Sequence, residues 1–310
     1  MPLDAGTLRI SGDAMAVGDD SRIGTAVATS QTFFPGTVEE VLLATAGNFP
    51  DALASAPLAG ALRAPTLLVP PDHVPTVVLD ELRRLSPERI TLLGGTAVIS
   101  TTVEAGVGTI APTVRRLGGA DRFATAVAIG DAVEQEVGAS TVYLATGMGF
   151  ADALAGGALT DGPILLVTAD SVPAVTLAAL QAWQPDRVVA FGGPVAISQA
   201  VLDQVAAATG ANVDRIWGPT RYATAAAVAG WFPAPAEMVL VATGENYPDA
   251  LAASGVAAAL DVPMLLVQRD AIPPEVTAEL TRLRPSAIGV LGGPVAISAS
   301  VHTALGGFVP

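Results

Sequence analysis

The sequence contains three copies of one unit of about 100 residues. Asp51, Asp152 and Asp249 take the same place in the segments TAGNFPDAL, TGMGFADAL and TGENYPDAL, and they lie 101 and then 97 residues apart. A unit of this length can bury a core of its own, whereas solenoid repeats of roughly 20–50 residues cannot. We therefore predict three modules, at residues 1–115, 116–214 and 215–310.

Two further motifs recur with the same period. Arg22, Arg122 and Arg221 stand in the blocks SRIGTA, DRFATA and TRYATA. The third motif is GGTAVIS at 94–100, which returns as GGPVAIS at 192–198 and 292–298. A single-site enzyme does not need three equivalent sites, so the triplication favours binding over catalysis. We expect no catalytic residue, no metal site and no cofactor.

Composition excludes several classes of function. The formal net charge is −14, which argues against nucleic acid as a partner because phosphate binding needs concentrated positive charge. All 15 basic residues are Arg, so a catalytic or phosphate-loop Lys is excluded. The chain has no Cys, and its two His stand at non-equivalent places of the repeat. A thiolate site or a repeated His-based site is therefore excluded.

The chain is apolar, with 51% hydrophobic residues and a mean hydropathy of +0.54. No stretch of about 20 residues is free of Gly, Pro and charge, so we expect no membrane insertion. The start, MPLDAGTLRI, lacks the pattern of a signal peptide. The protein is then expected to be cytosolic or a mature fragment.

Short apolar runs alternate with amphipathic ones in each copy, as in a strand–helix α/β unit. In the first copy we predict strands at 41–45, 66–70 and 90–94, with helices at 51–62, 75–85 and 100–107. Apolar strands separated by helices indicate a parallel sheet covered on both faces. The predicted fold class is α/β, with three Rossmann-like modules.

A fourth short strand recurs as TLRI (7–10), TVRRL (113–117) and NVDRI (212–216). No equivalent follows the third copy. If this strand belongs to the preceding module, TLRI completes the third sheet, closes the modules into a ring and brings the two termini together. The segment 13–19 then reads as an inserted surface loop.

The aspartates follow a strand and open a helix, which leaves two interpretations. Asp at a helix N-terminus caps free N–H groups. Ligands of parallel sheets also collect at the carboxyl ends of the strands, where these loops lie. Asn48 and Asn246 accompany the first and third aspartates, but the second copy has Gly149 and lacks the Pro, so its site is weakened if Asn is a ligand contact.

The arginines and serines of the other two motifs also allow more than one role. An Arg at the start of a helix is mildly unfavourable with respect to the dipole, so it either pairs with a repeated Asp across a module boundary or binds a carboxylate or phosphate. Ser100, Ser198 and Ser298 precede helices and are expected to be N-caps. The paired glycines before them mark a tight turn that is open to an anion.

The combination of RLGGADRFATA, ATGENYPDALAAS, a PILLV-type strand and GGPVAIS resembles the cell wall-binding repeat type 2 family of Gram-positive surface proteins, over residues 9–310. The resemblance implies Toprim-like or Rossmann-like modules packed with pseudo-threefold symmetry. It also implies noncovalent anchoring at the cell surface to an anionic secondary wall polymer, a glycan or a teichoic-acid-like chain, with an effector domain in a longer parent protein. The polymer would bind in grooves between modules, at Arg22, Arg122, Arg221, Asp51, Asp152, Asp249, Asn48 and Asn246.

Two alternatives stay open. The chain could be a hydrolase of wall glycan with carboxylates between modules, or a structural element of a surface layer. The charge of −14 should repel an anionic polymer at long range. Binding then requires local Arg clusters, helix N-termini or bridging cations.

Overall fold

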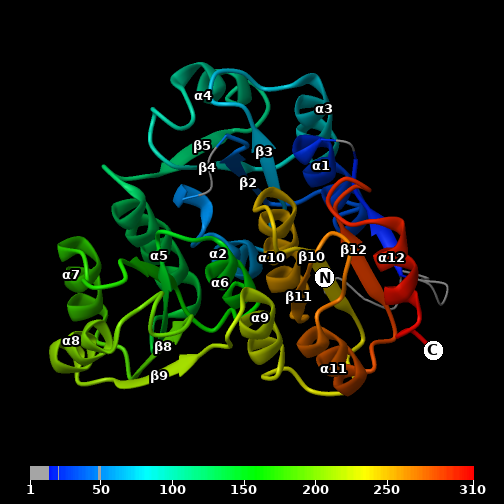
Figure 1. Cartoon of the computed structure of the whole chain (residues 1–310). Helices are drawn as coiled ribbons and strands as arrows, with labels where there is room; N and C mark the ends of the chain where they lie inside the picture. Colours follow the sequence, from blue (N-terminus) through cyan, green and yellow to red (C-terminus); the bar gives the residue numbers. More distant parts are fainter. Residues whose placement is uncertain (1–13, 20, 48–49) are drawn as a thin grey trace.

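The computed structural model describes residues 14–19, 21–47 and 50–310, and these form three parallel four-stranded sheets (Figure 1). The orders are β3-β2-β4-β5, β7-β6-β8-β9 and β11-β10-β12-β1. The strands are β1 (Met15–Val17), β2 (Glu40–Thr45), β3 (Thr66–Val69), β4 (Arg89–Leu93), β5 (Thr113–Leu117), β6 (Thr141–Thr146), β7 (Ile164–Val167), β8 (Arg187–Phe191), β9 (Asn212–Ile216), β10 (Val239–Thr243), β11 (Met264–Val267) and β12 (Ile288–Leu291). The predicted fold class is confirmed.

The central strands are buried along their length because helices cover both faces of each sheet. The helices are α1 (Arg22–Phe33), α2 (Ala56–Leu62), α3 (Thr76–Leu85), α4 (Thr101–Val107), α5 (Arg122–Val137), α6 (Ala151–Gly156), α7 (Ala174–Trp183), α8 (Gln199–Thr209), α9 (Arg221–Ala229), α10 (Pro248–Leu260), α11 (Pro274–Leu283) and α12 (Ala299–Gly306). None of the helices in the described ranges is long and apolar enough to cross a membrane.

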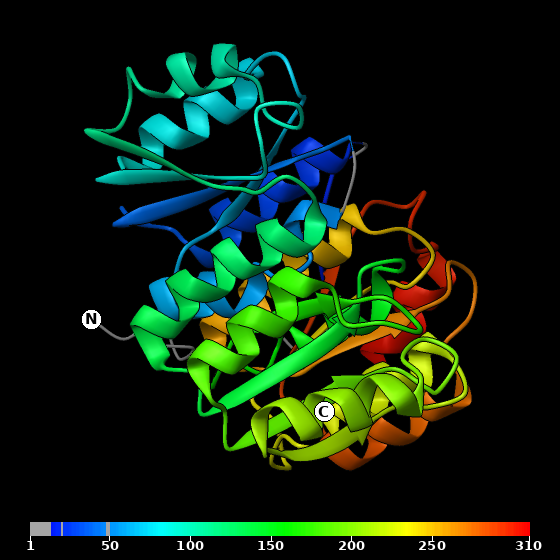
Figure 2. The same ribbon diagram turned by 90° about the vertical axis from the view of Figure 1, so that its left-hand side faces the viewer.

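The helices divide into an inner and an outer layer (Figures 1 and 2). The pairs α3/α4, α7/α8 and α11/α12 lie on the outer faces of the three sheets, while α2, α6 and α10 lie in the centre of the molecule. The helices α1, α5 and α9 lie between modules, because each packs on its own sheet and on the central helix of the preceding module. One hydrophobic cluster consequently runs through all three modules.

A pseudo-threefold axis passes through the central helices. Ala56, Gly157 and Ser254 are equivalent positions of the three copies. A Cβ placed on Gly157 would lie 2.6 Å from the Cβ of Ala56 and 3.5 Å from that of Ser254. Only very small side chains fit where the three helices meet, which explains the Ala, Gly and Ser that follow each PDAL-type block.

The ring is closed by a strand from the start of the chain. β1 pairs in parallel with β12, in the register Met15↔Gly289 and Val17↔Leu291. The prediction that a strand from the start of the chain completes the third sheet is confirmed. The residues of this strand are 15–17, however, and not TLRI at 7–10. TLRI and the N-terminal end lie outside the described residues. The prediction of a surface loop at 13–19 was wrong because this segment contains β1.

The error came from aligning the copies on their basic residues. Each fourth strand ends five residues before the arginine of the next helix, at Val17, Leu117 and Ile216. Copy one therefore has no insertion at this point, and counting back from Arg22 finds its strand.

Two other details differ from prediction. The helix predicted at 51–62 is divided into a 3₁₀ turn, η2 (Pro50–Ala52), and α2, which begins after Ser55. β5 and β9 cross residues 115 and 214, where we placed the module boundaries, and they complete the first and second sheets. The fourth strand of each of these two sheets thus leads directly into the first helix of the next module.

Candidate ligand-binding grooves between the modules

The repeated arginines are fixed at the boundaries between modules. Arg22, Arg122 and Arg221 are the first residues of α1, α5 and α9, as predicted. Their Nη1 atoms donate to the backbone oxygens of Ala46 (2.8 Å), Gly147 (2.5 Å) and Gly244 (2.5 Å), respectively, which follow the central strands β2, β6 and β10. Side chains of the caps Ser21, Asp121 and Thr220 accept hydrogen bonds from the first turns of these helices.

An aromatic residue of the preceding module lies against two of the arginines. The Arg22 guanidinium lies 5.7 Å from the ring centre of Tyr247 and donates to its hydroxyl at 3.3 Å. The Arg221 guanidinium lies 5.2 Å from the ring of Phe150. Both arrangements are cation–π contacts. Sequence reasoning missed these rings, although an aromatic residue two positions before each aspartate, at 49, 150 and 247, would have been a signal.

In every copy the aromatic residue precedes the aspartate by two positions, so the aromatic ring and the carboxyl belong to one loop. Tyr247 and Phe150 also contact each other edge to face, with ring centres 6.4 Å apart. The loops of the second and third modules therefore meet through their aromatic residues near the centre of the molecule.

Each aspartate lies over the first glycine of a GG turn in its own module. Gly94, Gly192 and Gly292 have φ of +114°, +105° and +124°, a region that side chains rarely adopt. A Cβ on these glycines would lie 2.9, 2.7 and 2.9 Å from Oδ2 of Asp51, Asp152 and Asp249, respectively. The GG block and the PDAL-type block thus recur together because the glycine leaves room for the carboxyl.

Burial changes the protonation of these carboxyls. It raises the pKa of Asp249 to about 6, although the Thr25 hydroxyl and the Arg22 guanidinium act in the opposite direction. Burial likewise raises the pKa of Asp152 against Thr224 and Arg221, and that of Asp51 against Arg122. Each aspartate therefore faces the arginine of the following module, and Asp249 faces that of the first.

The contacts of the aspartates and arginines bear on two interpretations made from the sequence, namely helix capping by the aspartates and ion pairs between the two residue types. Phe150 and Tyr247 occupy the N-cap positions of α6 and α10, so Asp152 and Asp249 are not the caps. The ion pairs among the described residues include none between a repeated Arg and a repeated Asp. Asp152 and Asp249 instead lie within the first turns of α6 and α10, next to the cap, and the arginines bind backbone oxygens.

The serines of the GG blocks behave unequally. Ser100 accepts a hydrogen bond from Val103 N, which confirms its predicted capping role. Ser198 and Ser298 take the N-cap positions of α8 and α12 without a side-chain capping bond. The position is therefore an N-cap in all three copies, but the hydroxyl caps the helix in the first alone.

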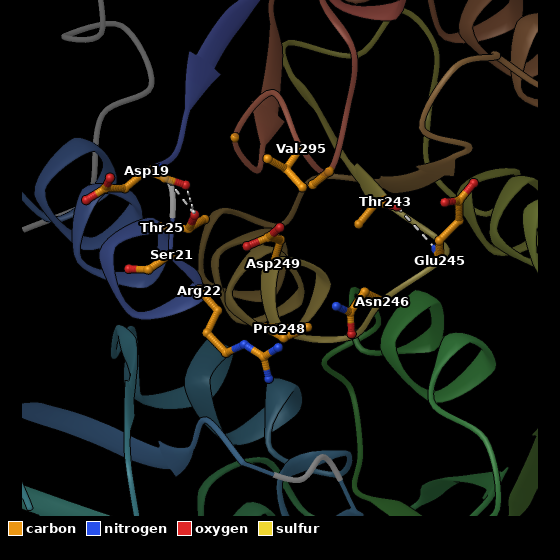
Figure 3. A pocket seen from close by; sticks show the side chains of 12 residues that line it. Asp19, Ser21, Arg22, Thr25, Thr243, Glu245, Asn246, Pro248, Asp249 and Val295 are labelled. Atoms are coloured by element: carbon orange, nitrogen blue, oxygen red, sulfur yellow. Dashed lines mark hydrogen bonds between the residues drawn. The ribbon is translucent and has the colours of Figure 1, made fainter.

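A groove between the third and first modules brings many of the predicted site residues together. This 3/1 groove has a volume of about 540 Å³ and contains Arg22, Asp249 and Asn246. Figure 3 shows the Asp249 carboxyl on the side of Thr25 and the Arg22 guanidinium beside Pro248. The rest of its lining is Asp19, Ser21, Thr25, Thr243, Glu245, Pro248, Gly293, Val295 and Ala296.

A smaller groove between the first and second modules repeats the arrangement. This 1/2 groove has a volume of about 260 Å³ and contains Asp51, Arg122 and the cap Asp121. Asn48 lies outside the described residues. At the boundary of the second and third modules, Arg221 and Asp152 keep the same relation. One Arg and one Asp of the predicted site therefore lie near each other at all three boundaries, without an ion pair between them.

Comparisons with known proteins agree with this geometry. The profile of the family Cell wall binding domain 2 (CWB2) matches residues 17–104, 116–202 and 215–302. The chain belongs to this family. It is a triplet of cell wall binding domains, and each match begins at or near the strand that completes the preceding sheet.

Similar proteins carry the same region within longer chains. The amidase enhancer of Bacillus subtilis (strain 168) is 28% identical over 97% of this chain and 42% of its own length. N-acetylmuramoyl-L-alanine amidase LytC of the same strain is 25% identical over 93% of this chain and 57% of its own. The CWB2 chain thus spans about half the length of the curated relatives it matches.

Solved structures share the fold. Cwp6 from Clostridium difficile superposes with a TM-score of 0.90 at 24% identity, over 96% of this chain and 48% of its own. Cwp8 from the same organism gives a TM-score of 0.84 at 25% identity, over 96% and 52%. The pseudo-threefold arrangement of the three modules is therefore shared with these structures. The family match implies a location at the bacterial cell wall or surface.

Proposed function

We propose that this chain anchors a longer surface protein noncovalently to the cell wall, by binding an anionic secondary polymer in the grooves between its modules. The observation that supports this most is the recurrence of one Arg and one Asp at all three boundaries. Each pair is completed by residues from two modules. The binding unit is then the closed trio and not a single repeat.

The chemistry of the 3/1 groove suits an acidic group. Arg22 stands at the start of α1, where the backbone N–H groups and the helix dipole favour an anion. Asn246 and Thr243 add amide and hydroxyl groups that can bind the hydroxyls of a sugar or glycerol unit. A guanidinium matches a phosphate or carboxylate because its N–H groups are held in a plane.

Three module boundaries with the same Arg and Asp on one rigid body suit a repetitive ligand. The continuous core makes the distances between grooves fixed, so a polymer that occupies one groove is presented to the next. Linked sites of this kind gain avidity without new contacts. Weak binding in each groove is then sufficient to hold the protein on the wall, and no catalysis is required.

Sedimentation with purified Gram-positive cell walls tests the proposal. The full chain should sediment with intact walls and stay in solution after the secondary polymers have been stripped. Retained binding to stripped walls would point to peptidoglycan or protein as the partner. Release of soluble glycan fragments during the incubation would support the hydrolase instead.

Substitution of the arginines locates the sites. Arg22→Ala, Arg122→Ala and Arg221→Ala should each weaken sedimentation, and the triple variant should abolish it. Arg83→Ala is the matched control, because Arg83 is exposed on the outer helix α3 and pairs with Asp80. If the triple variant folds and still sediments like the control, the grooves are not the binding sites.

A further inference from the structure

The 3/1 groove has an excess of negative charge that opposes an anionic ligand. Among the described residues that line it, Arg22 is the single cation, whereas Asp19, Glu245 and Asp249 are acidic. Two of these acids lie in loops that lead into α1 and α10, and Asp249 lies within the first turn of α10. An acidic polymer would therefore meet more like charge than opposite charge if all three carboxylates were ionised.

Asp249 is the least exposed of the three acids. Its carboxyl lies against the backbone of Gly292, where there is no room for a side chain. The groups around it are Arg22 and Thr25 of α1, Asp19 of the loop before α1, and Glu245 and Asn246 of its own loop. The turn after β12 contributes Gly293, Val295 and Ala296, none of which titrates.

The arginine does not neutralise this carboxyl directly. Arg22 donates through Nη1 to Ala46 O and Tyr247 Oη, and it forms no ion pair with Asp249. The carboxyl is therefore half-buried without an ion pair, and this burial raises its pKa to about 6. A proton on Asp249 removes one negative charge from the groove and converts an acceptor into a donor.

We propose that an acidic group of the ligand enters the 3/1 groove together with one proton, which binds Asp249. This inference rests on the proposed function and specifies the state of the groove that accepts the polymer. The protonated carboxyl donates a hydrogen bond to the oxyanion while Arg22 attracts it. By linkage, a bound anion also raises the affinity of Asp249 for its proton, because a like charge nearby disfavours the carboxylate.

If the inference is right, binding depends on pH and this dependence requires the Asp249 carboxyl. Wall binding of the full chain should weaken about tenfold or more between pH 5.5 and pH 7.5, because the protonated fraction of Asp249 falls over this range. Asp249→Asn keeps the size of the side chain and places a permanent donor in the groove. This variant should bind at pH 7.5 as tightly as the unmodified chain binds at pH 5.5, with little change between the two.

Asp80→Asn is the matched control, because Asp80 is exposed on α3 and lies outside the groove. It should keep the pH dependence of the unmodified chain. The walls are the same in all three measurements, so titration of the polymer itself cannot distinguish the variants. If Asp249→Asn weakens at high pH as much as the control does, the proton is bound elsewhere and the inference is wrong.

A second measurement needs no variant. Calorimetry with polymer released from the walls, at pH 6.5 in two buffers of different ionisation enthalpy, should give proton uptake upon binding. Uptake of no protons overturns the inference while the proposed function stands. Failure of the chain to bind walls at any pH would instead overturn the proposed function, so the two outcomes are distinct.

Discussion

The 3/1 and 1/2 grooves share one polar frame, by which we mean the Arg, the Asp and the glycine of positive φ, but the residues around this frame differ. In both, an arginine at the start of a helix faces an aspartate that lies over a glycine of positive φ. The volumes nevertheless differ, at about 540 and 260 Å³. The difference teaches that the repeat conserves the polar frame, while the residues around it set the size and polarity of each groove.

The cap of the adjoining helix is one such residue. Ser21 in the 3/1 groove is neutral, whereas its equivalent in the 1/2 groove is Asp121, which helps to raise the pKa of Asp51. The boundary of modules two and three differs again. There Trp217, which is 47% exposed, takes the place of a glycine, and its ring lies against Gly193. The three boundaries therefore offer a ligand three different surfaces around one frame.

The largest effect is expected from closing the space under the aspartate. Gly292→Ala places a Cβ 2.9 Å from Asp249 Oδ2 in a strained backbone conformation, and Gly94→Ala does the same to Asp51. Each should lower the free energy of unfolding by about 2–4 kcal/mol in denaturant titrations. Binding should be lost at the 3/1 groove in the first variant and at the 1/2 groove in the second. Gly36→Ala is the control, since nothing lies within 4 Å of its Cβ.

Asp249→Asn should stabilise the protein at neutral pH. The folded carboxyl has a pKa of about 6 against an ordinary value of 3.8, so the native state binds more protons than the unfolded state between these values. Stability then falls as the pH rises from 4 to 6. The variant should gain at most about 3 kcal/mol at pH 7.5 and nothing below pH 4. Asp51→Asn should act in the same direction, and equal stability of Asp249→Asn and the unmodified chain at pH 7.5 would contradict the prediction.

Arg22→Ala separates structural from binding roles of the frame. The substitution leaves Ala46 O with the Tyr247 hydroxyl as its remaining side-chain donor, so we expect a loss of about 1–2 kcal/mol in stability. Arg122→Ala removes the donor to Gly147 O and should cost a similar amount. Wall binding should fall more for Arg22→Ala, because its groove is larger. A loss of stability with unchanged binding would assign both arginines a structural role.

Much of the fold could be predicted from the sequence because the apolar strands are uninterrupted and occur three times. β1 could not be recognised in the same way. It has three residues, Met15–Val17, and its partner β12 lies at the other end of the chain. Closure of the three modules into a ring could be predicted only because no fourth strand follows the third copy. That argument assigned the closing strand to residues 7–10 and not to β1.

The candidate site was predictable in its membership but not in its contacts. The repeats identified Asp249 and Arg22, and the GG blocks indicated tight turns. They could not show that Asp249 lies over Gly292, because the two motifs are joined only by the parallel pairing of β10 and β12. Nor could they show that Arg22 binds a backbone oxygen, since every residue has one.

The smallest effect is expected from Tyr247→Phe, which makes the 3/1 boundary resemble the boundary of modules two and three. Tyr247 donates to Ala46 O at 2.9 Å, whereas the equivalent Phe150 has no hydroxyl and still lies against Arg221. Tyr247→Phe should therefore keep the contact between Arg22 and the ring, while it loses the hydrogen bond to Ala46 O and the long one accepted from Arg22. The expected cost is about 1 kcal/mol in thermal or denaturant unfolding. Wall binding should change less than in Arg22→Ala, because the guanidinium keeps its bond to Ala46 O. A loss of binding as large as that of Arg22→Ala would mean that the hydroxyl, and not the guanidinium, is the group that the ligand contacts.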